Sequence, residues 1–523
     1  MFPKSSACFR SRSTSSDPML ARLSRLPFLL MLFGLSGVAM ALPALYAGSL
    51  HDLHEARAFF YSAILILFIF SLIALAMSDT GREPRTVDFL VSLFLAFVAL
   101  PLVLALPFWW GLATTTYFNA YFEMLSAFTT TGATLFDPGG RLSPSLQLWR
   151  GLVAWMGGLM MWIAATAVFA PLSLGGFEVT ARTQPALGEG GQDHVDAAHP
   201  MKRWSRGALA LVPVYTGLTA IVWVLLLVLG ERGLTSLMHA MAVMSTSGIS
   251  DVGGLAQARA GLGGEIILFL FMLFALSRTT FSAETGTLRR DNVLRDHEVR
   301  LGLLIVVMVP AFLFLRHWLG AYEVNELQDA RAALRAAWGA VFTVLSFLTT
   351  TGFASVEWQT AQDWSGLGTP GMILLGLSIV GGGVATTAGG VKLMRVYVLY
   401  LQGLGEMQKL VHPSIVVAKG SENSRFQRKG SQIAWVFFML FAMSLALISV
   451  VLAGLGAGFE DAMVMAIAAL TNTGPLVSVA AETAIDLAKQ SEAVKAVLCA
   501  AMVLGRLETL AIIALLSPEL WHK

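Results

Sequence analysis

Long apolar runs, separated by short polar or basic segments, dominate the chain. A helix needs about 20 apolar residues to cross the hydrocarbon core of a bilayer. Seven runs without Asp, Glu, Lys or Arg are long enough: Leu26–Leu50, Ala58–Ser78, Phe89–Phe122, Gly151–Phe177, Gly207–Gly230, Trp364–Val391 and Gly430–Phe459. Three weaker runs are Ile266–Ala283, Leu301–Leu315 and Ala496–Leu516. The pattern predicts an all-α polytopic membrane protein with ten spans.

Two further apolar stretches, Ala336–Val356 and Ala462–Ala481, carry a cluster of Thr, Asn and Gly in mid-run. Backbone that is not helical leaves N–H and C=O groups unpaired, which is costly in hydrocarbon but tolerated beside a water-filled cavity. We therefore expect both stretches to be re-entrant segments and not spans.

One short pattern occurs four times. The copies are Phe128-Thr129-Thr130-Thr131-Gly132, Met244-Ser245-Thr246-Ser247-Gly248, Leu348-Thr349-Thr350-Thr351-Gly352 and Leu470-Thr471-Asn472-Thr473-Gly474. Each has hydroxyl residues three and one positions before the glycine and a small residue six before it. The similar spacings predict four tandem helix–pore loop–helix repeats around one pore, after two extra N-terminal helices.

The domain boundaries follow from this repeat. We expect a cytoplasmic N-terminus at 1–25, the two extra transmembrane helices at 26–84, and pore repeats at 85–205, 206–299, 300–430 and 431–523.

Four such loops can close a ring in which carbonyl oxygens replace the hydration shell of a cation. Glycine permits backbone conformations that turn carbonyls toward the axis, and each pore helix directs its negative end there. A single copy would be interpreted as a Ser/Thr-rich turn, but four copies with matched flanks favour a selectivity filter. The residues expected along the cation path are Thr130, Thr131, Gly132, Thr246, Ser247, Gly248, Thr350, Thr351, Gly352, Asn472, Thr473 and Gly474.

A glycine-rich stretch interrupts the apolar run that ends at Val391. Glycine costs about 0.8–1.0 kcal/mol relative to alanine in a helix interior, so the helix should break there. Small residues also permit close helix packing, but this stretch has more glycines than packing requires. We expect an unwound gating loop below the filter at 381–390, built on Gly381, Gly382, Gly383, Gly389 and Gly390.

Several charged residues lie within or beside these elements. Arg506 is in the middle of the last apolar run, where a lone charge costs at least ~2.5–3.5 kcal/mol. It either pairs with Glu508 or faces the ion path.

Three acids follow filter glycines and either focus cations or are solvated loop residues: Asp137, Asp251 and Glu357. Glu123 and His239, nine residues before their glycines, are expected to tether the pore helices by hydrogen bonds.

Composition supports a membrane protein. Of 523 residues 56% are hydrophobic and 13% are charged, whereas soluble proteins have about 25% charged residues. A water-soluble enzyme and a nucleic-acid binder are therefore excluded, and the net charge of +2 suits no polyanion. Cys8 and Cys499 are too far apart in sequence to indicate a disulfide framework or a metal cluster.

Charge distribution sets the predicted orientation. The segment Lys392–Lys429, taken as a loop, has seven basic residues and two acids, which places it in the cytoplasm. Counting the ten spans in both directions from this segment places both termini in the cytoplasm.

The first apolar run follows a basic segment but is longer than the core of a signal peptide, so we expect an uncleaved helix.

The filter loops, the run Gly381-Gly382-Gly383-Val384-Ala385-Thr386-Thr387-Ala388-Gly389-Gly390-Val391-Lys392 and the late Gly505-Arg506-Leu507-Glu508 resemble the Trk/Ktr/HKT superfamily of potassium transporters, in particular its TrkH type. The resemblance covers nearly the whole chain. It departs from the usual pattern at Ser247 and in the glycine-rich run, which lacks a Cys and a central Gly that many members have.

This resemblance implies inward potassium transport across the bacterial inner membrane. It also implies a homodimer in which each protomer has its own pore, and a cytosolic nucleotide-binding subunit of the RCK (KTN) type, similar to TrkA. Glycine in all four filters goes with a preference for potassium, and Arg506 near the path goes with gating. No catalytic residue, bound cofactor or nucleic-acid partner is implied.

Two other classes stay open at this point. Gly34-Leu35-Ser36-Gly37 matches a short element of intramembrane serine proteases, but no histidine in a clear span can serve as its base. An ordinary secondary transporter would have inverted halves with paired broken helices, whereas this repeat is fourfold.

Overall fold

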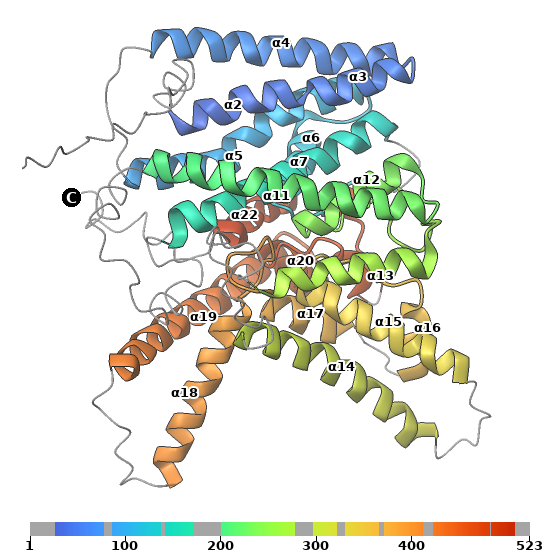
Figure 1. The fold of residues 1–523 in the computed structure, drawn as a ribbon, viewed down its shortest axis with the longest axis vertical. Coiled ribbons are helices and arrows are strands. Elements are labelled where there is room, and N and C mark those ends of the chain that lie inside the picture. Colours follow the sequence, from blue (N-terminus) through green and yellow to red (C-terminus); the bar gives the residue numbers. More distant parts are fainter. Residues whose placement is uncertain are drawn as a thin grey trace, which may run out of the picture.

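The computed structural model describes residues 27–77, 86–136, 142–170, 200–277, 296–321, 330–365, 371–411, 422–481 and 483–507. Within these ranges the chain forms helices and turns and no strand, and the apolar helices pack side by side (Figure 1). The expectation of an all-α polytopic membrane protein is confirmed.

Eight helical stretches in the described ranges are long and apolar enough to cross a membrane. Seven correspond to predicted spans: α2 (Phe28–Ala39) with α3 (Ala41–Ser49), α4 (Leu53–Ala76), α5 (Thr86–Gly111), α7 (Pro144–Ala164) with its π-helical extension (Ala165–Phe169), α11 (Pro200–Val228), α14 (His297–Ala321) and α19 (Glu422–Gly454). The eighth lies in α15 (Ala330–Leu348), which leads into the third Thr-rich pattern. Its length and composition suit a span, but its C-terminal end continues into a loop that is buried inside the bundle.

Three predicted spans have other bounds within the described residues. The first, α13 (Gly261–Met272), ends in a 3₁₀ turn at Leu273–Leu276. The second, α17 (Gly371–Val380), ends where the glycine-rich stretch begins, so the predicted break is confirmed, while Trp364 belongs to a separate helix, α16 (Trp358–Ser365). The third, α22 (Glu492–Leu507), begins before the predicted run, and 508–516 lie outside the described residues.

Each of the four repeated patterns follows directly on a pore helix. The pore helices are α6 (Tyr117–Phe128), α12 (Gly233–Ser245), α15 and α20 (Phe459–Leu470). The prediction of a single span over Phe89–Phe122 is wrong, because α5 ends at Gly111 and Thr116 begins α6 as its N-cap, accepting a hydrogen bond from Asn119 N. The turn between the two helices contains no charged residue, so the two helices form one uninterrupted uncharged run in the sequence.

The pore helices and the helices next to them pack in a ring. Each pore helix contacts an apolar helix that precedes it in the chain and one that follows it: α5 and α7 contact α6, α11 and α13 contact α12, α14 and α17 contact α15, and α19 and α22 contact α20. The helix that follows each filter also contacts the next pore helix, in the pairs α7 with α12, α13 with α15, α17 with α20, and α22 with α6. The last pair joins the end of the chain to its first pore helix, so the bundle closes around a centre.

The basic segment Lys392–Lys429 is not the loop that the sequence suggested. Residues 393–411 form helix α18 (Leu393–Val411), and residues 422–429 are the start of α19. In Figure 1, α18 reaches the bottom of the view and the free end of α19 lies at the lower left. The buried guanidinium of Arg395 on α18 lies 3.7 Å from the ring centre of Phe437 on α19, a cation–π contact that holds them together.

Candidate functional site

Each pore helix ends in a filter segment of four residues. The segments, numbered one to four, are Thr129–Gly132, Ser245–Gly248, Thr349–Gly352 and Thr471–Gly474. Their second residues, Thr130, Thr246, Thr350 and Asn472, have φ angles of 55°, 52°, 56° and 53°. This left-handed conformation costs about 1–2 kcal/mol for a residue with a Cβ and is most unusual for a β-branched one. Its occurrence at four equivalent positions shows that the four segments share one backbone geometry.

Hydroxyl side chains hold this turn from behind. The first hydroxyl of each segment donates to the carbonyl oxygen four residues earlier, at 2.8, 2.8, 2.9 and 2.8 Å in segments one to four. It also lies 2.8–3.2 Å from the hydroxyl oxygen of the third residue of the same segment. All eight hydroxyl residues are buried. The recurring Ser and Thr hydroxyls therefore support the backbone turn.

The glycine that ends each segment lies against the next segment. A Cβ would overlap an atom of the following segment or of the residue directly after it in four cases: Gly132 with Ser247 O, Gly248 with Thr351 O, Gly352 with Pro475, and Gly474 with Ala133 N. The order runs from one to two, three, four and back to one. The four segments thus meet in a ring, and glycine is required at each junction by the lack of space.

Segment four departs from the other three. Gly132, Gly248 and Gly352 have positive φ, whereas Gly474 does not. Its N–H instead donates to Thr131 O at 2.6 Å. Asn472 Nδ2 adds a hydrogen bond of 2.9 Å to Thr131 Oγ1, so the fourth segment is joined directly to the first. The expectation that every filter glycine serves backbone rotation is therefore wrong for Gly474, which serves the close approach alone.

The glycine-rich stretch is a buried loop that packs against these segments. Gly381 and Gly390 have positive φ, and they are packed so closely on neighbouring backbone that no Cβ fits. Gly389 N donates to Thr350 Oγ1 at 2.8 Å, and Thr246 Oγ1 donates to Thr387 Oγ1 at 3.1 Å. The loop therefore contacts the left-handed residues of segments two and three directly.

Charged side chains hold the loop on opposite sides. Glu298, buried at the start of α14, accepts a hydrogen bond from Val384 N at 3.0 Å. Arg506, buried on α22, donates through Nη1 to Thr387 O at 2.6 Å. Lys392 Nζ donates to Ala388 O. An acidic group thus fixes the first half of the loop and basic groups fix the second half.

Comparison with known proteins identifies the chain. The family model described as "TrkH: Cation transport protein" matches residues 267–523. The Trk system potassium uptake protein TrkI of Halomonas elongata is 30% identical over 436 residues, which are 82% of this chain and 81% of that protein. The chain belongs to the TrkH family. TrkH of Salmonella typhimurium is 26% identical over 92% of this chain and 96% of its own.

A solved structure shares the fold of this TrkH-family chain. The crystal structure of the potassium transporter TrkH from Vibrio parahaemolyticus matches with a TM-score of 0.78, at 24% identity, over 95% of this chain and 99% of that one. The resemblance to the TrkH type is therefore confirmed, and family membership places the chain among transport proteins and not enzymes. The protease-like element is a packing site in α2, since Gly34 lies against Phe70 and Gly37 against Leu67.

The outer ends of the filter segments are held by polar contacts. Glu123 accepts from Leu135 N at 3.1 Å and pairs with Arg150 Nε at 2.7 Å, and His239 Nε2 lies 2.9 Å from Ser250 Oγ. The expectation that Glu123 and His239 act as tethers is confirmed.

The acids that follow the filter glycines make local contacts. Asp251 accepts from Thr235 Oγ1 at 2.8 Å, and Glu357 accepts from Thr360 Oγ1 at 3.0 Å. Asp137 and Glu508 lie outside the described residues, so the alternative pairing of Arg506 with Glu508 stays open.

Sequence reasoning missed two buried glutamates of this TrkH-family chain. Glu298 holds the glycine-rich loop, and Glu265 on α13 accepts from Val356 N beyond segment three at 2.7 Å. Glu265 is the one charged residue of α13 and directly precedes an apolar run, and an isolated acid at such a position can signal function. Glu298 lies among other charged residues just before an apolar run. The sequence around it is typical of the start of any helix, so it gives no signal of a special role.

Proposed function

We propose that this TrkH-family protein carries potassium ions inward across the bacterial inner membrane along the axis of the filter ring. The observation that supports this most strongly is the closure of four equivalent segments into a ring, with each glycine against the next segment. Carbonyl groups from four loops can replace the water around a cation at such a centre. The relatives named above are potassium uptake proteins, which favours potassium as the ion.

The proposed path is lined by the last three residues of each segment, acting mainly through backbone carbonyls. These residues are Thr130, Thr131, Gly132, Thr246, Ser247, Gly248, Thr350, Thr351, Gly352, Asn472, Thr473 and Gly474. Thr131 O has a second role, because it accepts from Gly474 N. No covalent step and no bound cofactor belongs to this function; potassium is the cargo.

We place the gate at the glycine-rich loop, with Gly381, Gly382, Gly383, Gly389, Gly390 and Arg506 as its residues. The loop is buried beneath the filter, so an ion that leaves the filter inward meets it. The guanidinium of Arg506 opposes a cation there. Two like unit charges about 6 Å apart at an effective dielectric constant near 20 repel by roughly 2.8 kcal/mol.

We also propose a homodimer in the inner membrane, with both termini and the α18–α19 hairpin in the cytoplasm. The excess of basic residues between Lys392 and Lys429 supports this orientation. A cytosolic nucleotide-binding subunit of the RCK type, similar to TrkA, is proposed to dock on this face and to act on the loop through α18, which begins directly after the loop.

Potassium uptake in a bacterial strain that lacks its own potassium uptake systems tests this function. The strain with the chain should grow at low external potassium and take up rubidium, whereas the strain with the empty vector should not. Varying the sodium and proton gradients separately tests whether either ion is coupled. Normal membrane expression without uptake above the empty vector would contradict the proposal.

A further inference from the structure

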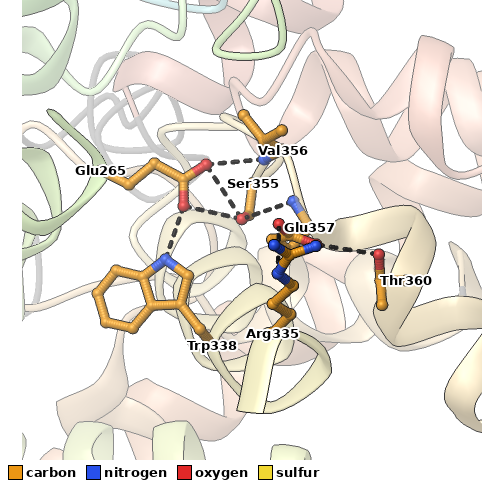
Figure 2. A network of polar contacts seen from close by, with 7 residues as sticks. All are labelled: Glu265, Arg335, Trp338, Ser355, Val356, Glu357 and Thr360. Carbon is orange, nitrogen blue, oxygen red and sulfur yellow. Dashed lines mark hydrogen bonds and ion pairs between the residues drawn. The ribbon is translucent and has the colours of Figure 1, made fainter. Parts of the chain in front are cut away.

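Glu265 lies at the centre of a polar network between two repeats (Figure 2). The side chain is on α13, which follows filter segment two, and it is 2% exposed. Its Oε1 accepts from Val356 N at 2.7 Å and its Oε2 accepts from Trp338 Nε1 at 2.7 Å. Ser355 Oγ donates to the same carboxylate, at 2.9 Å from Oε2 and 3.1 Å from Oε1. All three donors belong to the part of the chain around segment three.

Two of these donors, Ser355 and Val356, lie just beyond the end of segment three, which the proposed function makes its outer exit. Ser355 and Val356 follow Gly352 by three and four residues, and Ser355 N donates to Thr343 Oγ1 at 3.2 Å. Thr343 is on the pore helix that leads into the segment. The exit is therefore held from its own pore helix on one side and from the preceding repeat on the other.

In segment one, a carboxylate also holds the backbone after the filter glycine, but it comes from the same repeat. Leu135 N, three residues after Gly132, donates to Glu123 on the pore helix of the same repeat. Arg150 pairs with that carboxylate, whereas the interactions of Glu265 are hydrogen bonds from an indole, a hydroxyl and a backbone amide. A carboxylate thus fixes the outer backbone of two filter segments, and only in segment three does another repeat supply it.

We propose that Glu265 is a positioning residue that sets the ion selectivity of filter segment three from the neighbouring repeat. This inference rests on the proposed function. Peptide groups are planar, with N–H and C=O on opposite sides, so holding Val356 N–H fixes the direction of the Ser355 carbonyl and limits the freedom of the chain back to Gly352. A filter that distinguishes ions by their carbonyl shell depends on such restraint.

The chemistry of the network requires a carboxylate. Both oxygens of Glu265 face N–H donors, one from Val356 and one from Trp338. A glutamine has one carbonyl oxygen and one NH₂ group, so it must direct the NH₂ group at one of the two N–H groups. A buried donor left without an acceptor costs about 1–3 kcal/mol. Replacing Trp338 by Phe removes one donor, and the amide oxygen can then serve Val356.

Three variants test the role of the Glu265 hydrogen bonds: Glu265→Gln, Trp338→Phe and the double variant. Each full-length protein is placed in liposomes, and the ratio of potassium to sodium flux is measured together with the melting temperature. We expect Glu265→Gln to lower the ratio about tenfold, equivalent to about 1.4 kcal/mol. Trp338→Phe should change it less than about twofold, and the double variant should match Trp338→Phe.

Glu357→Gln is the matched control. Glu357 is on the same outer loop, but its side chain is partly exposed and pairs at 3.8 Å with the exposed Arg335 (Figure 2). This change removes the same charge without touching the held backbone. An unchanged flux ratio is expected, because a surface pair of this kind contributes little.

A wild-type ratio in folded Glu265→Gln, or a double variant as impaired as Glu265→Gln, would overturn the proposal. An equal loss in Glu357→Gln would overturn it as well, since charge alone would then explain the effect. If Glu265→Gln does not fold, the double variant is compared with Trp338→Phe, and a tenfold lower ratio in the double variant contradicts the positioning role. Wild-type liposomes without potassium flux would instead contradict the proposed function.

Discussion

Gly132, Gly248, Gly352 and Gly474 share one constraint and differ in another. All four lie so close to the next segment that a Cβ would overlap it. The first three also need the positive φ that glycine adopts easily, and Gly474 does not. The strained residue common to all segments is instead the second one, and the side-chain hydroxyls around it offset part of that strain.

Gly132→Ser tests the ring at one junction. A serine at this position has its Cβ against Ser247 O in a backbone conformation that disfavours it. We expect the potassium-to-sodium flux ratio to fall at least about tenfold, which corresponds to about 1.4 kcal/mol of lost discrimination. The control is Gly217→Ser on α11, where a Cβ meets nothing within 4 Å. Equal flux ratios in the two variants would remove Gly132 from the filter.

The sequence predicted the filter positions because four copies of one pattern are visible without a structure. It could not predict the left-handed Thr130 and Thr350, since threonine rarely adopts this conformation and only the surrounding hydrogen bonds impose it. It also could not predict the partners of Glu265, which are about 70 to 90 residues away in the chain.

At the scale of elements, hydropathy located the helices but not all of their ends. The Phe89–Phe122 run crosses an uncharged turn, so α5 and α6 were merged, and the basic stretch after the glycine-rich loop contains α18. The break at Gly381 was predictable from composition. Its tertiary anchors, Glu298 and Arg506, come from helices far away in the sequence and required the fold.

Arg506→Ala tests the loop as a gate. Removing the guanidinium deletes the hydrogen bond to Thr387 O and the repulsion of a cation beneath the filter. Potassium flux in liposomes should rise by up to about a hundredfold if the full charge repulsion is lost, with an unchanged potassium-to-sodium ratio. Glu298→Ala, which releases Val384 N, should act in the same direction without adding to it, because both act on one loop.

Lys495→Ala is the control for Arg506→Ala. Lys495 is a buried base on the same helix, but it donates to Asn119 Oδ1 and Ala488 O and does not contact the loop. Its flux should stay near wild type. Folded Arg506→Ala and Glu298→Ala proteins that conduct like wild type would show that the loop is a packing element.

On the scale of the whole molecule, each repeat depends on the next one. The helix after each filter packs on the following pore helix, and α22 closes the order against α6. The sequence predicted four tandem units but not which helix lies against which pore helix. The boundaries between the repeats stay a prediction, and Glu265 shows that support for a filter can cross them.

The helices α18 and α19, which we propose to face the cytoplasm, give a prediction about assembly. Replacing Arg425, Arg428 and Lys429 together by serine removes three positive charges near the start of α19. We expect reduced co-purification of the nucleotide-binding subunit and loss of nucleotide-dependent flux, with basal flux retained. Arg259→Ser, an exposed charge in the segment after filter two, is the control. Unchanged assembly in the triple variant would show that these charges serve orientation only.

The position of a bound ion is the most direct test of potassium binding inside the ring of the four filter segments. Rubidium can replace potassium, and crystals grown in rubidium can be measured at its absorption edge, where anomalous difference density locates the ion. We expect peaks on the axis enclosed by Thr130–Gly132, Thr246–Gly248, Thr350–Gly352 and Asn472–Gly474, and weaker peaks in Gly132→Ser. Rubidium density confined to another part of the bundle, with none inside the ring, would contradict it.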